Sequence, residues 1–154
     1  MAAKGAHLLI LCFIALWSSV RPTAIKFEDC GSAGEVKEVN VDPCNDPNMC
    51  TFYTGSVVHA NLTFVPTDDA TSLTLRTYAI FGNTTILLPS PDSDACKNSG
   101  IQCPLKGGSS ATYQKQLTIP SSLPEINALL RIELRDQKQR KVVCIKIMVR
   151  VVKQ

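Results

Sequence analysis

Apolar residues downstream of position 35 recur mostly at every second position, and short clusters of turn-forming residues separate these stretches. Such alternation is typical of strands that bury one face. It predicts seven short strands, at residues 34–41, 56–65, 73–81, 83–88, 110–119 and 126–136 and in the segment after the polar turn at 136–140. Strands of this kind bury their apolar faces best as two packed sheets, so the pattern predicts a single all-β sandwich domain.

Two Asn-X-Thr sequons help to assign the faces of the predicted strands. They begin at Asn61 and Asn83, and such sequons accept N-linked glycans, which must face solvent. An outward Asn61 places Val58 on the inner face of its strand and His59 on the outer face. An outward Asn83 turns Ile86 to the opposite face.

The later strands alternate in the same way, with one interruption. Residues 110–119 place Tyr113, Leu117 and Ile119 on one face, although Lys115 breaks the pattern. Apolar and charged side chains alternate in the next strand, with Ala128, Leu130, Ile132 and Leu134 on one face and Arg131, Glu133 and Arg135 on the other. In the last strand the residues that share the apolar face are Ile145, Ile147, Val149 and Val151.

The first 24 residues have the pattern of a secretory signal peptide. Lys4 supplies the positive charge, the ten apolar residues at 8–17 form the core, and small or polar residues follow. Ten apolar residues are fewer than the about 20 that a transmembrane helix needs. A buried N-terminal helix is the alternative, which the charged flank disfavours. We expect cleavage between Ser19 and Ala24, which leaves a domain at residues 25–154.

Composition and charge narrow the class of protein. The 154 residues are 45% hydrophobic and 19% charged, with a formal net charge of +3. Removal of Lys4 and Arg21 with the signal peptide leaves 14 basic and 13 acidic residues, a balance unlike that of a generic nucleic-acid binder. The richest later apolar segment, at 142–152, is too short to span a membrane and contains Lys146 and Arg150.

Six cysteines follow the predicted signal peptide, an even number, as a secreted disulfide framework requires. They are Cys30, Cys44, Cys50, Cys96, Cys103 and Cys144. Six cysteines allow 15 pairings. A zinc site is the alternative, but it is disfavoured because neither close pair has C-x2-C spacing and the mature chain has one histidine. With the sequons, the cysteines indicate an oxidising, secretory environment.

The spacing of these cysteines narrows the pairings. Cys44 and Cys50 flank a turn rich in Pro, Asn and Asp, so they can close a small loop. Cys96 and Cys103 flank another short segment and can do the same. The two remaining cysteines lie near opposite ends of the mature domain.

The residues offer no credible catalytic constellation. Nucleophilic catalysis by Ser or Cys needs a base, most often His, and His59 lies on the predicted outer face. Asp68 and Asp69 belong to a turn, where solvated carboxylates are the simpler interpretation than a glycosidase pair. No Gly-rich phosphate loop is present. We therefore expect a protein that is not an enzyme and that has no metal and no cofactor.

Four segments resemble the Niemann-Pick type C2 proteins of the MD-2-related lipid-recognition (ML) family. They are FEDCGS at 27–32, VKEVNVDPC at 36–44, PD at 91–92 and GIQCPL at 100–105. The similarity covers about residues 25–152 and includes all six cysteines in order. It implies an immunoglobulin-like β-sandwich of about seven strands in two sheets, with a lipid cavity between them. It also implies the disulfides Cys30–Cys144, Cys44–Cys50 and Cys96–Cys103.

The resemblance also supplies candidate lipid-binding positions. They are Val58, Ile86, Ile119, Leu123, Ile132 and Ile145, of which Ile119 and Leu123 correspond to residues at the pocket mouth. Ordinary core packing is the alternative for each of them. Aliphatic side chains stand at positions where vertebrate relatives have aromatic ones, which weakens the case for cholesterol as the preferred ligand.

The function implied by the resemblance is secreted lipid binding and transfer. The expected partners are a sterol, a fatty acid or another lipid, together with a transient membrane or membrane-protein acceptor, and a monomer is expected. The role is sterol transport within cells or extracellular carriage, and the lysosomal lumen is a second possible destination. The alternatives are recognition of bacterial lipids, carriage of semiochemicals, and a ligand-free immunoglobulin-like adhesion module.

Overall fold

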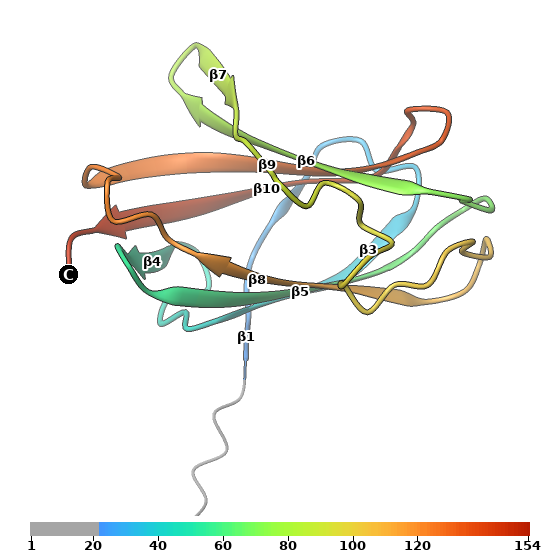
Figure 1. The fold of residues 1–154 in the computed structure, drawn as a ribbon, viewed down its shortest axis with the longest axis horizontal. Helices are drawn as coiled ribbons and strands as arrows, with labels where there is room; N and C mark the ends of the chain where they lie inside the picture. Colours follow the sequence, from blue (N-terminus) through green and yellow to red (C-terminus); the bar gives the residue numbers. More distant parts are fainter. Residues whose placement is uncertain (1–21) are drawn as a thin grey trace, which may run out of the picture.

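Two β-sheets lie face to face in the computed structural model, which describes residues 22–154 (Figure 1). The four-stranded sheet contains, in spatial order, β1 (Thr23–Ala24), β3 (Glu35–Asp42), β5 (Val57–Val65) and β8 (Ala111–Thr118). The six-stranded sheet contains β2 (Glu28–Asp29), β10 (Lys141–Val152), β9 (Ile126–Asp136), β6 (Leu73–Phe81) and β7 (Thr84–Leu87), with β4 (Cys50–Tyr53) beside β10. Within residues 22–154 no helix is long and apolar enough to cross a membrane.

The all-β sandwich expected from the alternation is confirmed. The seven predicted strands correspond to β3 and to β5–β10, with ends that differ by a few residues. Three short strands were not predicted. Two of them, β1 and β2, have two residues each and are too short to show a period, and β4 pairs in parallel with the distant end of β10. This pairing joins residues about a hundred positions apart, so local alternation cannot predict it.

The structure describes only the last residues of the expected signal peptide. Residues 1–21 of the expected signal peptide lie outside the described residues. Its last two residues, Thr23 and Ala24, form β1 and pair with Val41 and Asn40 of β3. The Thr23 hydroxyl also donates a hydrogen bond to the carbonyl oxygen of Cys44, at 2.8 Å. These two residues are therefore part of the folded domain.

The core fills the space between the sheets and follows the alternation. On β5, Val58, Leu62 and Phe64 are buried, whereas His59 is exposed. On β10 the apolar side chains at every second position also face the other sheet. The buried ones are Ile145, Ile147, Val149 and Val151. The core therefore consists of rows of mainly aliphatic side chains from both sheets, with aromatic ones such as Phe64 among them.

The three disulfides join the pairs that the resemblance implies. Cys30–Cys144 spans 114 residues and connects the segment after β2 to the middle of β10. Cys44–Cys50 and Cys96–Cys103 close loops with separations of 6 and 7 residues. The long disulfide therefore holds the N-terminal segment on the edge of the six-stranded sheet.

Glu133 is a buried charge on the outer face of β9. The alternation assigns Glu133, Arg131 and Arg135 to this face, but only Glu133 is almost completely covered, at 2% exposure. Arg131 lies 3.1 Å from one carboxylate oxygen and Arg135 2.7 Å from the other. Arg131 also stacks over the Tyr78 ring, 4.2 Å from its centroid. The two arginines therefore cover and neutralise the carboxylate.

Candidate functional site

The four-stranded sheet presents two rows of side chains to the space between the sheets. One row crosses β3, β5 and β8 through Val39, Leu62 and Tyr113. The next row crosses the same strands through Val41, Ala60 and Lys115. All six residues line one cavity. Because residues paired across antiparallel strands point to the same face, the register alone brings these distant positions together.

The six-stranded sheet closes the cavity from the other side. Thr77 of β6, Ile132 of β9 and Ile145 of β10 form a cross-strand row that faces it. Leu75 and Ile147 extend this wall on either side. The row supplies two branched aliphatic side chains and one hydroxyl, so this wall is almost entirely apolar.

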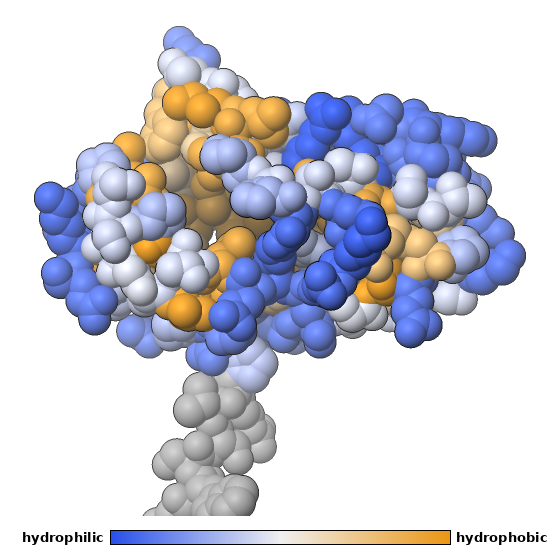
Figure 2. All heavy atoms as spheres, in the orientation of Figure 1, coloured by the Kyte–Doolittle hydropathy of each residue, from blue (hydrophilic) through white to orange (hydrophobic). Residues whose placement is uncertain are grey.

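The cavity has a volume of about 80 Å³ and apolar walls. Figure 2 shows a hollow lined by hydrophobic residues between the β6–β7 hairpin and the strand β8. Four large apolar side chains from these parts of the fold are exposed: Ile86 and Leu87 on β7, Leu117 on β8 and Leu123 in the connection from β8 to β9. Leu117 also lines the cavity. The apolar interior therefore continues to the surface at this edge.

Lys115 is the charged residue in this lining. Its side chain is 21% exposed, and its Nζ lies 3.5 Å from Oδ2 of Asp92, a residue in the segment after β7. The neighbouring inward residue, Tyr113, is buried, and burial together with the negative charge of Asp92 raises the pKa of its hydroxyl to about 12. The lining of an otherwise largely apolar cavity therefore includes an ammonium group and a neutral phenol.

The six candidate lipid-binding residues occupy three different environments. Ile132 and Ile145 line the cavity. Val58 and Ile119 are buried in the core beside it, at 1% and 8% exposure, and are not part of its lining. Ile86 and Leu123 are exposed, at 49% and 37%.

Several lining residues were not among the candidates. They are Val39, Val41, Ala60, Asn61, Leu62, Leu75, Thr77, Tyr113, Leu117, Ile147 and, above all, Lys115. The alternation contains the signal that finds Lys115, because this residue lies two positions from both Tyr113 and Leu117. Lys115 therefore does not interrupt the strand. It occupies an inward position of the alternation, so its charged side chain faces the interior.

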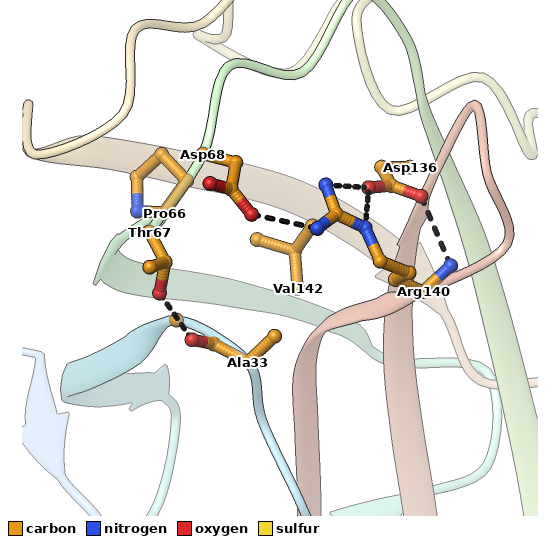
Figure 3. A pocket seen from close by; sticks show the side chains of 8 residues that line it. Ala33, Pro66, Thr67, Asp68, Asp136, Arg140 and Val142 are labelled. Carbon is orange, nitrogen blue, oxygen red and sulfur yellow. Dashed lines mark hydrogen bonds and ion pairs between the residues drawn. The ribbon is translucent and has the colours of Figure 1, made fainter.

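A second crevice, of about 10 Å³, lies at another place in the fold and has both apolar and charged residues in its walls (Figure 3). Arg140 bridges two carboxylates there, at 2.6 Å from Asp68 and 2.8 Å from Asp136. Asp136 is buried and also accepts hydrogen bonds from the backbone amides of Lys138 and Arg140. These contacts join the β9–β10 turn to the segment after β5, so we interpret the crevice as structural.

Asp136 predicts a pH dependence of stability. Burial opposes ionisation of its carboxyl, but hydrogen bonds from Arg140 and Lys138 outweigh it and hold the pKa below its usual value. In acid the unfolded state then binds the proton more readily, so stability falls as pH drops below about 4. Urea unfolding between about pH 5 and pH 2 should show a shallower pH slope for Asp136→Asn than for the parent. Equal slopes would contradict the assignment.

The comparisons with known proteins agree with this architecture. The family model described as "ML domain" matches residues 24–151. The chain is 34% identical to NPC intracellular cholesterol transporter 2 of Bos taurus, over 90% of this chain and 93% of that protein. It is 32% identical to the protein of the same name from Mus musculus, over 98% and 99% of the two chains.

A solved structure shows the same fold. The structure of a Niemann-Pick type C2 protein from the Japanese carpenter ant superposes with a TM-score of 0.79 and 25% sequence identity. The match covers 83% of this chain and 100% of that chain. The resemblance noted in the sequence is thereby confirmed. The chain belongs to the ML domain family.

Proposed function

We propose that this protein binds a lipid between its two sheets and transfers it between membranes or carriers. The observation that supports this most directly is the apolar cavity between the sheets, which opens at an edge with exposed apolar side chains. The bovine and mouse relatives are named as intracellular cholesterol transporters. The function requires no covalent chemistry, and the one histidine of residues 22–154, His59, is exposed on an outer face.

The size of the cavity defines how a lipid enters. Pockets for small molecules usually measure about 300–1,000 Å³, whereas this cavity measures about 80 Å³. A lipid must therefore push the sheets or the β6–β7 hairpin outward as it enters. Burial of about 400 Å² of ligand surface supplies roughly 10 kcal/mol, from which several kcal/mol are lost to ordering and widening.

We place the candidate residues at different depths of this site. Ile132 and Ile145 contact the lipid inside the cavity. Val58 and Ile119, which are buried beside it, come into contact as the cavity widens. The exposed side chains of Ile86 and Leu123 form the entrance.

We also propose that the protein enters the secretory pathway, for secretion or delivery to the lysosomal lumen. The three disulfides support this, because such bonds persist in oxidising compartments. Asn61, on the outer face of β5, and Asn83, exposed in the β6–β7 turn, are the expected glycan acceptors. Because Thr23 pairs with β3, we place signal cleavage before this residue.

An immunoglobulin-like adhesion module is the competing function. Antibody-type domains have a disulfide between the two sheets that packs against a buried Trp. Here the long disulfide connects Cys144 of β10 with Cys30, directly after β2, and both strands belong to the six-stranded sheet. Residues 22–154 contain no Trp. The arrangement therefore favours a lipid carrier.

Native mass spectrometry tests the proposed function. We expect protein purified from a eukaryotic host without added lipid to carry a co-purified lipid, or to take one up from vesicles that contain cholesterol and oleate. The bound species should leave with organic extraction and return on re-incubation. A protein that stays empty after incubation with both lipids would contradict lipid carriage.

A further inference from the structure

Lys115 lies in an unusual position for a charged side chain. Outward positions on β8 are available on both sides of it, and Gln114 and Gln116 occupy them and are exposed. Lys115 instead faces inward across from Ala60 of β5 and lines the cavity, with 21% of its side chain exposed. Burial of an ammonium group beside apolar walls is costly unless an anion compensates it. Without an anion in the cavity, a lysine at this position destabilises the fold. An anionic ligand would compensate its charge.

Within residues 22–154, the one ion pair of Lys115 is with Asp92. The two atoms are 3.5 Å apart, longer than the about 2.7–2.9 Å of a tight charge-assisted hydrogen bond, and the Asp92 side chain is 78% exposed. Such a solvated pair contributes little to stability. A second carboxylate can therefore join or replace Asp92 at small cost.

The rest of the lining suits a single chain with one polar end. The Tyr113 hydroxyl, two positions from Lys115 on the same strand, is protonated at neutral pH, and burial raises its pKa further, to about 12. The other lining residues are nine apolar ones, Val39, Val41, Ala60, Leu62, Leu75, Leu117, Ile132, Ile145 and Ile147, together with Asn61 and Thr77. A linear acyl chain is thinner than a fused ring system, so it widens a cavity of about 80 Å³ less than a sterol does.

We propose that Lys115 binds the carboxylate of a long-chain fatty acid whose acyl chain lies between the sheets. This assignment rests on the proposed function and specifies its ligand class. Asp92 holds the ammonium group at the edge of the cavity and yields to the ligand carboxylate. A neutral lipid of the same length gains no charge-assisted bond there, so the protein selects anionic lipids over neutral ones.

The test compares oleate with oleyl alcohol, which differ only in the head group, together with cholesterol. Dissociation constants are measured by isothermal titration calorimetry, below the concentration at which oleate forms micelles. We expect the parent to bind oleate about tenfold more tightly than oleyl alcohol. In Lys115→Met this preference should disappear, through weaker oleate binding, while the affinity for oleyl alcohol changes by less than about threefold. Lys115→Arg should retain the preference.

Lys146→Met is the matched control. Lys146 is also partly covered, at 27% exposure, and pairs with an exposed carboxylate, that of Glu28 at 2.8 Å. It lies on the outer face of the six-stranded sheet, paired with Arg131, so its loss should leave both affinities unchanged. Asp92→Asn, which removes the competing carboxylate, should strengthen oleate binding.

The outcomes separate the two proposals. If the parent binds oleate and oleyl alcohol equally well, or if Lys115→Met keeps the preference, lipid binding stands and the carboxylate site is wrong. If the parent binds none of the three lipids, the proposed function fails and the carboxylate site fails with it. Thermal unfolding of each variant identifies a loss of affinity that comes from loss of fold.

Discussion

Ile132→Trp is expected to lower the affinity for lipid at least a hundredfold, about 2.7 kcal/mol. Ile132 lies in the centre of the row that runs from Thr77 to Ile145 and faces the cavity. An indole at this position occupies most of a cavity of about 80 Å³, and the widened space that a lipid needs is then no longer accessible. Titration of the variant and the parent with a radiolabelled or fluorescent lipid measures the loss.

Leu129→Trp is the control for this substitution. Leu129 belongs to the same strand but lies three residues away, so it points to the outer face, where it pairs with Met148 and Ile80. We expect it to bind lipid as the parent does. Overpacking should cost Ile132→Trp no more than about 1–3 kcal/mol of stability. Unchanged lipid binding by a folded Ile132→Trp protein would show that the ligand does not enter between the sheets.

Removal of the Cys30–Cys144 disulfide is expected to lower the free energy of unfolding by about 4–5 kcal/mol. The disulfide closes a loop with a separation of 114 residues, and the loss of loop entropy in the unfolded chain grows with loop length. The double variant Cys30→Ser, Cys144→Ser leaves no unpaired thiol from this pair. Urea unfolding followed by circular dichroism measures the change, which is a large share of the about 5–15 kcal/mol typical of a domain.

The Cys96–Cys103 pair provides the internal comparison. Its separation is 7 residues, for which the same chain-entropy argument gives only about 2–3 kcal/mol. The double variant Cys96→Ser, Cys103→Ser should therefore be the more stable of the two. Equal losses of stability would mean that loop entropy does not determine how much each disulfide contributes. Native contacts around the cysteines would then determine it.

The fold leaves the edge of the sandwich near β7 and β8 free of disulfides that link the two sheets. In the proposed function the sheets or the β6–β7 hairpin move outward as a lipid enters, because the cavity measures only about 80 Å³. The long disulfide lies on the edge of the six-stranded sheet at β2 and β10, whereas the exposed apolar side chains gather near β7 and β8. The long disulfide therefore strengthens the six-stranded sheet without linking it to the other sheet, and the exposed apolar side chains lie away from it.

Most of the fold followed from the sequence because each of the seven predicted strands carries a local signal. Alternation along β5 places Val58 and Leu62 inside and His59 outside, and the structure agrees. Local patterns could not reveal β4, whose existence depends on the far end of β10. They also could not reveal that Glu133 is buried, because its cover consists of arginine side chains that a binary pattern counts as solvated.

The proposed binding site could be predicted from the sequence only in part. Period two turned Ile132 and Ile145 inward, but it could not show that they face a cavity while Val58 faces packed core. That distinction depends on cross-strand register and on the distance between the sheets, which are properties of the assembled sandwich. Lys115 illustrates the difference: its inward position was already present in the spacing, but only the tertiary structure placed it at the cavity and beside Asp92. Local alternation sets the direction in which a side chain points, and packing between sheets decides what it meets there.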